Sequence, residues 1–120
     1  MEKFEWRHLD TDELKWLAVD FDETLAKNSG YPDFTPGEPV EGAVEAMKKL
    51  NNLGWKIIIH TARHWSDYSG IENWLNFYKI PFRRIVCGKL MARYYIDDRA
   101  IGFRGDWNSV LKEINESLDN

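Results

Sequence analysis

The sequence predicts a three-layer α/β fold, a Rossmann-like arrangement in which helices cover both faces of a central parallel β-sheet. Short apolar runs alternate along the chain with segments of helical periodicity, each run stops at polar residues, and glycine or proline separates many segments. Strands that alternate with helices form parallel sheets, because the chain must cross back over the sheet before it adds the next strand. The 120 residues leave room for one such domain and for no cap domain.

Five apolar runs are predicted as strands of this sheet. The run 16–19 comes first, and we expect it at the centre of the sheet; 56–60 follows it. The third strand is 84–87, and the shorter runs 94–96 and 101–103 are the fourth and fifth. The single domain therefore begins at the first of these runs and extends to the end of the chain.

Three helices and one long loop connect the predicted strands. Apolar residues recur at helical spacing within 40–53, 71–78 and 107–118. Asp106 is predicted to cap the last helix, because its carboxylate can accept a hydrogen bond from the first helical turn. The segment 26–39 is predicted as a loop, and it contains Gly30, Pro32, Pro36, Gly37 and Pro39.

Composition narrows the classes of function and location. A net charge of -4 argues against a general attraction to nucleic acid or anionic membranes, although a local basic site stays open. No apolar stretch is long enough to span a bilayer. Residues 1–15 are predicted as a charged N-terminal extension that could form one short helix and is not a signal peptide. Cys87 is the only cysteine, so we expect no internal disulfide and a reducing, cytoplasmic location.

Polar side chains follow the predicted strands at the points where the strands end. The first four strands are followed, in order, by Asp20 and Asp22, by Thr61 and Arg63, by Lys89, and by Asp97 and Asp98. Carboxyl ends of parallel strands meet at one edge of the sheet, where ligands bind. Clustered carboxylates repel one another without a cation, and aspartates without histidine or cysteine suit Mg²⁺. Lysine, arginine and a hydroxyl group suit phosphoryl oxygens, so the pattern indicates phosphoryl transfer.

This pattern resembles the haloacid dehalogenase superfamily, in its phosphatase branch. That family has an apolar strand ending in Asp-x-Asp-x-Thr, a second strand ending in Ser or Thr, a later lysine, and a strand ending in paired acids. The matching residues here are Asp20, Asp22, Thr24, Thr61, Lys89, Asp97 and Asp98. The match covers roughly residues 16 to 115, and its specificity comes from the order of all four motifs.

The resemblance implies a role for each of these residues. Asp20 would attack phosphorus and form an aspartyl-phosphate, and Asp22 would protonate the leaving oxygen and then activate water. Thr61 and Lys89 would hold the phosphoryl oxygens. The implied ligands of Mg²⁺ are Asp20, the backbone carbonyl of Asp22, Asp97 and Asp98.

A closer similarity exists to small bacterial and phage members of the superfamily and to the phosphatase domains of polynucleotide end-repair enzymes. It rests on Thr61-Ala62-Arg63 and on the segment 96–101, and it makes Arg63 a substrate or phosphate contact. Two departures are visible. Glu23 stands where many members have glycine, and Arg93 offers a second cation four residues after Lys89.

Several alternatives remain open from the sequence. A response-regulator receiver domain also uses a phosphorylated aspartate, but its acid pair comes early in the chain rather than last. A non-catalytic binding scaffold could keep the fold. For an enzyme, the substrate is expected to be a phosphate monoester, such as a sugar phosphate, a nucleotide or a nucleic-acid end. An uncapped site could be closed by the loop 26–39 or by a second subunit.

Overall fold

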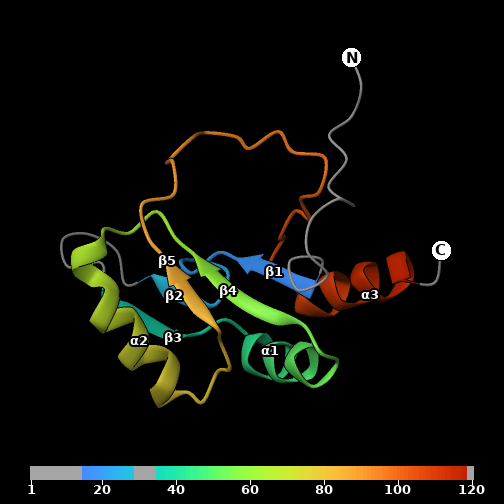
Figure 1. Ribbon diagram of the computed structural model, residues 1–120, viewed down its shortest axis with the longest axis horizontal. Helices are drawn as coiled ribbons and strands as arrows, with labels where there is room; N and C mark the ends of the chain where they lie inside the picture. The colour runs from blue at the N-terminus through green and yellow to red at the C-terminus, as the bar shows by residue number, and fades with distance from the viewer. Residues whose placement is uncertain (1–14, 29–34, 119–120) are drawn as a thin grey trace.

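The computed structural model describes residues 15–28 and 35–118, which form an α/β domain with a three-stranded parallel sheet (Figure 1). The strands are β1 (Trp16–Val19), β4 (Lys56–His60) and β5 (Arg84–Val86), in the order β1-β4-β5. The helices are α1 (Ala43–Asn52), α2 (Tyr68–Phe77) and α3 (Trp107–Leu118). The predicted Rossmann-like α/β class with a parallel sheet is confirmed.

The order of the strands differs from the expectation that 16–19 is central. β4 occupies the centre, with Leu17 of β1 paired to Ile57 and Ile85 of β5 paired to Ile59. β1 therefore lies at an edge and has one neighbouring strand among the described residues. β4 is also the strand with three consecutive buried isoleucines, as expected for a strand with neighbours on both sides.

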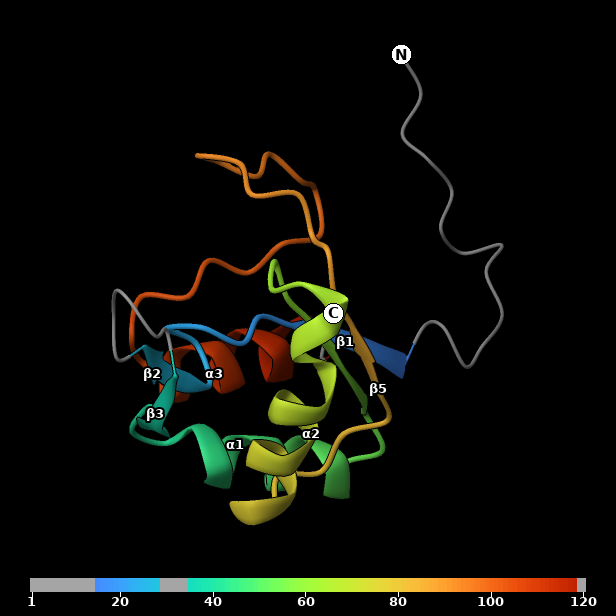
Figure 2. The same ribbon diagram turned by 90° about the vertical axis from the view of Figure 1, so that its left-hand side faces the viewer.

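The two faces of the sheet are covered differently. Odd-numbered strand residues belong to the hydrophobic core together with buried residues of all three helices: Val19, Ile57, Ile59, Ile85, Met47, Leu75 and Ile114. Figure 2 shows the helices on one side of the strands. The even-numbered residues point to the other face, because side chains alternate along a strand. In the described part of the chain, that second face carries no helix. The described residues therefore form two of the three predicted layers, the sheet and one layer of helices.

The helix ends follow from local hydrogen bonds. The N–H groups of Gly54 and Trp55 bond the carbonyls of Asn51 and Leu50, which closes α1 in a Schellman motif. α2 ends in the same way at Lys79, a residue with φ of 57° at a position that favours glycine.

The start of α3 also matches the sequence expectation. The Asp106 carboxylate accepts a hydrogen bond of 3.0 Å from the N–H of Asn108, which confirms the predicted cap.

Part of the predicted loop 26–39 forms a hairpin instead. β2 (Ala26–Asn28) pairs antiparallel with β3 (Pro36–Pro39), and the residues between them, 29–34, lie outside the described residues. Proline is accepted here because this two-stranded sheet has only edge strands, where an N–H can face away from the partner. The Trp74 indole donates to the Gly37 carbonyl at 2.8 Å, which fixes β3 to α2.

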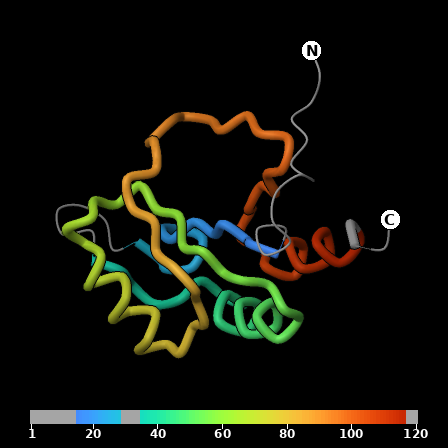
Figure 3. Tube along the Cα trace, in the orientation of Figure 1, coloured from blue at the N-terminus to red at the C-terminus, as the bar shows by residue number. Residues whose placement is uncertain are grey.

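The predicted fourth and fifth strands, 94–96 and 101–103, are absent from the structure as described. Residues 87–106 form neither helix nor strand and arch away from the sheet before they return to α3 (Figures 1 and 3). Five large apolar side chains of this segment are more than half exposed: Leu90, Met91, Tyr94, Tyr95 and Ile96. A run of three apolar residues predicts a strand only if a neighbouring strand pairs with it, and none does here.

Two expectations concern the chain as a whole. The predicted helix within the N-terminal extension 1–15 falls almost entirely on residues 1–14, which lie outside the described residues. Within the described residues, no helix combines the length and the apolar character needed to cross a membrane.

Candidate functional site

In the turn after β1, the buried side chain of Phe21 anchors the backbone between two aspartates, Asp20 and Asp22. Phe21 is fully buried and contacts the Trp74 ring edge-on at 5.1 Å between centroids. Its carbonyl accepts the N–H groups of Thr24, Leu25 and Ala26, which forces a tight turn. Asp20 and Asp22 flank this anchor and stay partly exposed at the carboxyl end of β1. The Thr24 hydroxyl lies 3.4 Å from the Asp20 carboxylate.

Arg63 forms a two-point ion pair with Asp22. Its Nε and Nη2 atoms donate to the two carboxylate oxygens of Asp22 at 2.9 and 2.8 Å. The guanidinium also lies 5.6 Å from the centroid of the Phe21 ring. Two parallel charge-assisted hydrogen bonds fix both orientation and position, so these two side chains act as one unit although 41 residues separate them.

Backbone hydrogen bonds hold the ends of β4 and β5 together. The Thr61 N–H bonds the Val86 carbonyl, and the Lys89 N–H bonds the Thr61 carbonyl, both at 2.9 Å. Thr61 is fully buried, and its hydroxyl accepts the Arg63 N–H at 3.1 Å. The Lys89 backbone therefore lies beside Thr61, and its ammonium lies 4.5 Å from the centroid of the Tyr95 ring, in the segment 87–106.

Electrostatic effects are consistent with one crowded end of the sheet. Burial lowers the pKa of His60, the nearby positive charge of Lys89 lowers it further, and Asp20 partly opposes this. The hydrogen bonds to Asp22 raise the pKa of Arg63, so the guanidinium stays charged. The pKa of the buried Cys87 thiol is raised by burial, which makes this cysteine a weak nucleophile.

Sequence-predicted residues are thus gathered from three strand ends, but the acid pair is not among them. Asp97 and Asp98 lie exposed in the segment 87–106, and the Asp97 carboxylate accepts the nearby Arg99 N–H at 2.9 Å. Within the described residues, no three His, Cys, Asp or Glu side chains lie close enough to hold a metal ion. The oxygen donors Asp20 and Asp22 suit Mg²⁺ chemically, but they are too few to form a complete site.

A shallow hollow lies beside the Arg63 side chain. It is lined by the start of α2 and the start of β3, through Thr35, Pro36, Arg63, Ser66, Asp67, Ser69, Gly70 and Ile71. Most of these side chains are polar or small. The hollow therefore offers room for a polar group next to the ion pair. Trp65, which precedes Ser66 in the sequence, is exposed and stacks on Tyr68 with 6.2 Å between the ring centroids.

Two residues of the site carry no recognisable signal in the sequence. The Asn28 side-chain amide donates to Asp22 at 3.1 Å, although the sequence placed Asn28 in a loop. The Trp107 indole donates to the Thr24 carbonyl at 2.9 Å, across 83 residues of sequence. Both contacts depend on packing, of β2 and α3 respectively, that no local pattern encodes.

The fold recurs in two solved structures of bacterial proteins. A structural-genomics target from Vibrio cholerae aligns with a TM-score of 0.68 and 30% identity, over 85% of this chain and 94% of that one. This chain belongs to the same family as the Vibrio cholerae protein. A conserved protein from Bacteroides thetaiotaomicron aligns with a TM-score of 0.63 and 28% identity, over 85% of this chain and 90% of that one. No protein-family model and no curated protein matches the chain, so the chemistry of this family is inferred from its residues.

Proposed function

We propose that this protein is a phosphatase of the haloacid dehalogenase type that hydrolyses phosphate monoesters through an aspartyl-phosphate on Asp20. One observation carries the proposal. Asp20, Asp22, Thr61, Arg63 and Lys89 come from three strands far apart in sequence and meet at the carboxyl end of one parallel sheet. This combination of carboxylates, cations and a buried hydroxyl suits the transfer of a phosphoryl group.

The reaction has two steps that use the same two aspartates. First, Asp22 leaves the ion pair with Arg63 and takes a proton from solvent; an oxygen of Asp20 then attacks phosphorus, the ester P–O bond breaks, and Asp22 gives that proton to the leaving oxygen. In the second step, water attacks the phosphorus, Asp22 takes the proton of that water, and the bond between phosphorus and Asp20 breaks. Phosphate leaves, and both side chains return to their starting states.

Three cationic or hydroxyl groups would bind the phosphoryl oxygens. Thr61 and Lys89 lie beside each other through their backbone hydrogen bond, and Arg63 follows Thr61 by two residues. Arg63 holds the carboxylate of Asp22, which must become available to reach the ester oxygen. We infer that phosphoryl oxygens compete for the guanidinium and release Asp22, because a phosphate offers the same two-point geometry.

The proposed reaction includes Mg²⁺, for which Asp97 and Asp98 would complete the set of ligands. The cation, when bound, would neutralise the phosphate charge, with Asp20, the Asp22 carbonyl and the acid pair as its ligands. The acid pair must then move to the strand ends. β1 has a neighbouring strand on one side only among the described residues, and Tyr94–Ile96 directly precede the acids. This segment would add to β1 as a fourth parallel strand.

The length of the chain allows this addition. Lys89 is tied to the end of β4, and five residue steps lead from it to Tyr94, a reach of at most ~18 Å. The start of a strand beside β1 lies about two strand spacings sideways and three or four residues back, a diagonal of ~16 Å. The connection would cross the face of the sheet that carries no described helix and would bury Leu90 and Met91 there.

The hollow beside Arg63 supports a substrate with a polar group next to its phosphate. No cap covers the site in the described residues, so the substrate class extends from sugar phosphates and nucleotides to phosphorylated nucleic-acid ends. A homodimer would close the site from outside and is compatible with each of these substrates.

A phosphatase panel tests the proposal. The wild-type protein and Asp20→Asn are assayed on phosphate monoesters with and without Mg²⁺, with Glu45→Gln on the exposed side of α1 as the matched control. We expect Asp20→Asn to lower kcat at least about 1,000-fold, because it removes the nucleophile, and Glu45→Gln to leave kcat unchanged. Arg63→Gln is expected to raise KM, because a phosphate contact is lost.

Three outcomes would contradict the proposal. Activity that survives in Asp20→Asn removes the covalent mechanism. A wild-type protein that hydrolyses no monoester with Mg²⁺ supports the non-catalytic scaffold instead. A phosphorylated protein that persists for minutes without release of phosphate would indicate a receiver-like role.

A further inference from the structure

The opposite, amino-terminal end of the sheet carries a second group of clustered side chains, which are aromatic and basic. Each of the three strands begins next to an aromatic residue that has a basic neighbour in sequence. The pairs are Lys15 and Trp16 at β1, Trp55 and Lys56 at β4, and Phe82 and Arg83, followed by Arg84, at β5. We call these seven residues the amino-end surface.

Contacts within the amino-end surface join rings to cations. The Lys15 ammonium lies 5.2 Å from the centroid of the Trp55 ring, and the Arg84 guanidinium lies 5.4 Å from that of Trp16. The register of the sheet sets Trp16 opposite Lys56, and the Arg83 N–H bonds the Ile57 carbonyl at 2.7 Å. The three strand starts therefore form one continuous surface.

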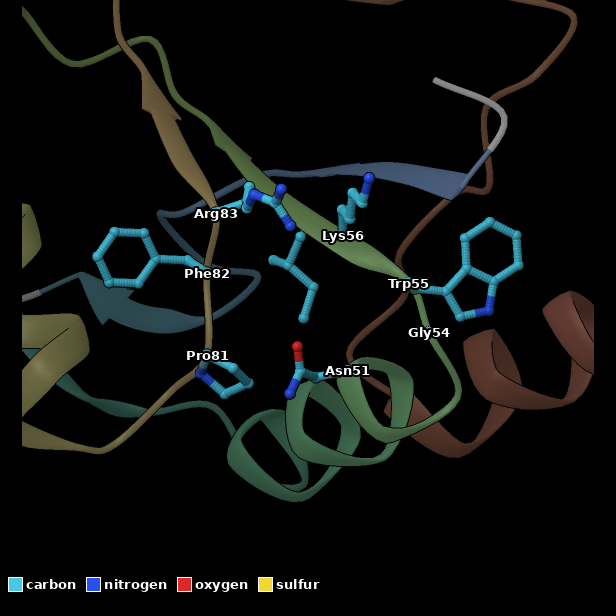
Figure 4. Close-up of a pocket in the computed structure, with 8 residues that line it drawn as sticks. Asn51, Gly54, Trp55, Lys56, Pro81, Phe82 and Arg83 are labelled. Carbon is cyan, nitrogen blue, oxygen red and sulfur yellow. The ribbon is translucent and has the colours of Figure 1, made fainter. Parts of the chain in front are cut away.

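A hollow opens in the middle of this surface. Figure 4 shows Trp55 and Phe82 on its two sides, with Lys56 and Arg83 between them and Asn51 from α1 below. Lys15, Arg83 and Arg84 are exposed, and the Trp16 side chain is 37% exposed. Trp55 and Phe82 are partly exposed, so all three rings reach the surface beside a cation.

The charge of this surface contrasts with that of the whole chain. The described segments 48–57 and 78–86, which form the α1–β4 and α2–β5 connections, contain no Asp or Glu. The chain as a whole has a net charge of -4. Positive charge is therefore concentrated in these two connections at the amino-terminal end of the sheet, whereas Asp20 and Asp22 lie at its carboxyl end.

We propose that the amino-end surface binds single-stranded nucleic acid. Cations beside aromatic rings are the pattern that recognises single strands, because phosphates bind the cations while unstacked bases stack on the rings. A duplex hides the faces of its bases, and a protein partner with acidic side chains would not use the rings in this way. This proposal does not rest on the phosphatase function, since the surface lies at the other end of the strands.

Fluorescence anisotropy with a 12-nucleotide deoxythymidine strand tests the proposal. The strand carries a dye at its 5′ end and no terminal phosphate, so recognition of a phosphate monoester at Asp20 plays no part. The variants are Arg83→Glu/Arg84→Glu and, separately, Trp16→Ala. The matched control, Lys112→Glu/Arg104→Glu, makes the same change of net charge at exposed positions on α3 and in the segment 87–106. Circular dichroism checks that each variant is folded.

We expect the wild-type protein to bind the strand and Arg83→Glu/Arg84→Glu to bind it at least tenfold more weakly. The slope of log K against log salt should become shallower by about 1.4, because two phosphate contacts are lost. Trp16→Ala should weaken binding with little change in that slope, because it removes stacking rather than charge. The control should change affinity less than threefold.

Three results would overturn the proposal. The wild-type protein could fail to bind the strand at 50 mM salt. The control variant could lose as much affinity as the arginine variant, which would indicate attraction by net charge alone. Sedimentation could show a wild-type dimer that Arg83→Glu/Arg84→Glu dissociates, without binding of the strand, which would identify a second copy of the chain as the occupant.

Discussion

Residues 16–88 and residues 89–106 hold their predicted site residues in different ways. In the first region, Asp20 and Thr61 follow strands whose odd-numbered side chains pack in the core with residues of three helices, and hydrogen bonds join the strand ends. In the second region, Asp97 and Asp98 follow Ile96, which is 100% exposed. The comparison indicates that a residue at the end of a strand is held in place by the buried side chains that precede it in the chain. Asp20, Asp22, Thr61 and Arg63 are positioned in this way, and the acid pair is not.

The largest expected effect compares one isoleucine from each region. Ile59→Ala should lower the free energy of unfolding by about 2–5 kcal/mol, because Ile59 is fully buried at the centre of the sheet. Ile96→Ala should change it by less than about 0.5 kcal/mol in the absence of Mg²⁺. Urea denaturation measures both. A cost above 1 kcal/mol for Ile96→Ala would show that its segment is already packed against the domain.

The next effect tests how firmly the first region holds Arg63. Thr61→Val keeps the shape of a fully buried side chain but removes the acceptor of the Arg63 N–H. We expect a loss of about 1–3 kcal/mol in the free energy of unfolding, because a partly buried donor is left without its partner. Thr24→Val is the control, since its hydroxyl lies 3.4 Å from Asp20 and makes a weak hydrogen bond. Equal losses in both variants would contradict this account.

A smaller effect comes from the ends of α1 and α2, which have the same hydrogen bonds but different residues at the left-handed position. Lys79 has φ of 57°, whereas Gly54 has φ of 96°. Lys79→Gly should raise the free energy of unfolding by about 0.5–1 kcal/mol, and Gly54→Ala should lower it by about 1 kcal/mol. Changes of the same sign in the two variants, measured by thermal denaturation, would refute the strain at Lys79.

The smallest effect is a pH dependence of stability at the carboxyl end of the sheet. The pKa of His60 is lowered in the folded protein, mainly by burial, so the unfolded chain binds a proton at higher pH. The contribution of His60 to the free energy of unfolding is fully present above the pKa of about 6.5 that His60 has in the unfolded chain. It is lost as the pH falls from there toward the lower pKa of the folded protein. His60→Gln should therefore lose less stability between pH 7.5 and pH 5.5 than the wild-type protein. Urea midpoints at the two pH values measure this, and equal losses would contradict it.

The sequence predicted those elements whose signal is local. Buried runs such as 56–60 and the helix 107–118 appear where expected, because periodicity and capping are properties of neighbouring residues. The hairpin of β2 and β3 was missed, since its prolines normally indicate a loop.

The sequence also predicted strands that the described structure lacks, because a strand forms only where another strand pairs with it. Tyr94–Ile96 have the composition of a strand, but no described strand pairs with them. In the site, five of the seven predicted residues meet at the strand ends. The Asp22–Arg63 ion pair and the Asn28 contact could not be predicted, because side-chain partners separated in sequence leave no trace in the local pattern.

The account depends most on whether the acid pair joins Asp20 and Asp22 around one cation. Amide hydrogen exchange of residues 94–96, with and without Mg²⁺, tests this directly in the wild-type protein and in Asp97→Asn. We predict that Mg²⁺ slows exchange at those amides of this segment that face β1 in the wild-type protein, because alternate N–H groups become hydrogen-bonded to β1, and that Asp97→Asn abolishes the effect. Exchange that Mg²⁺ leaves unchanged, in a protein shown by calorimetry to bind Mg²⁺, would contradict the proposed centre.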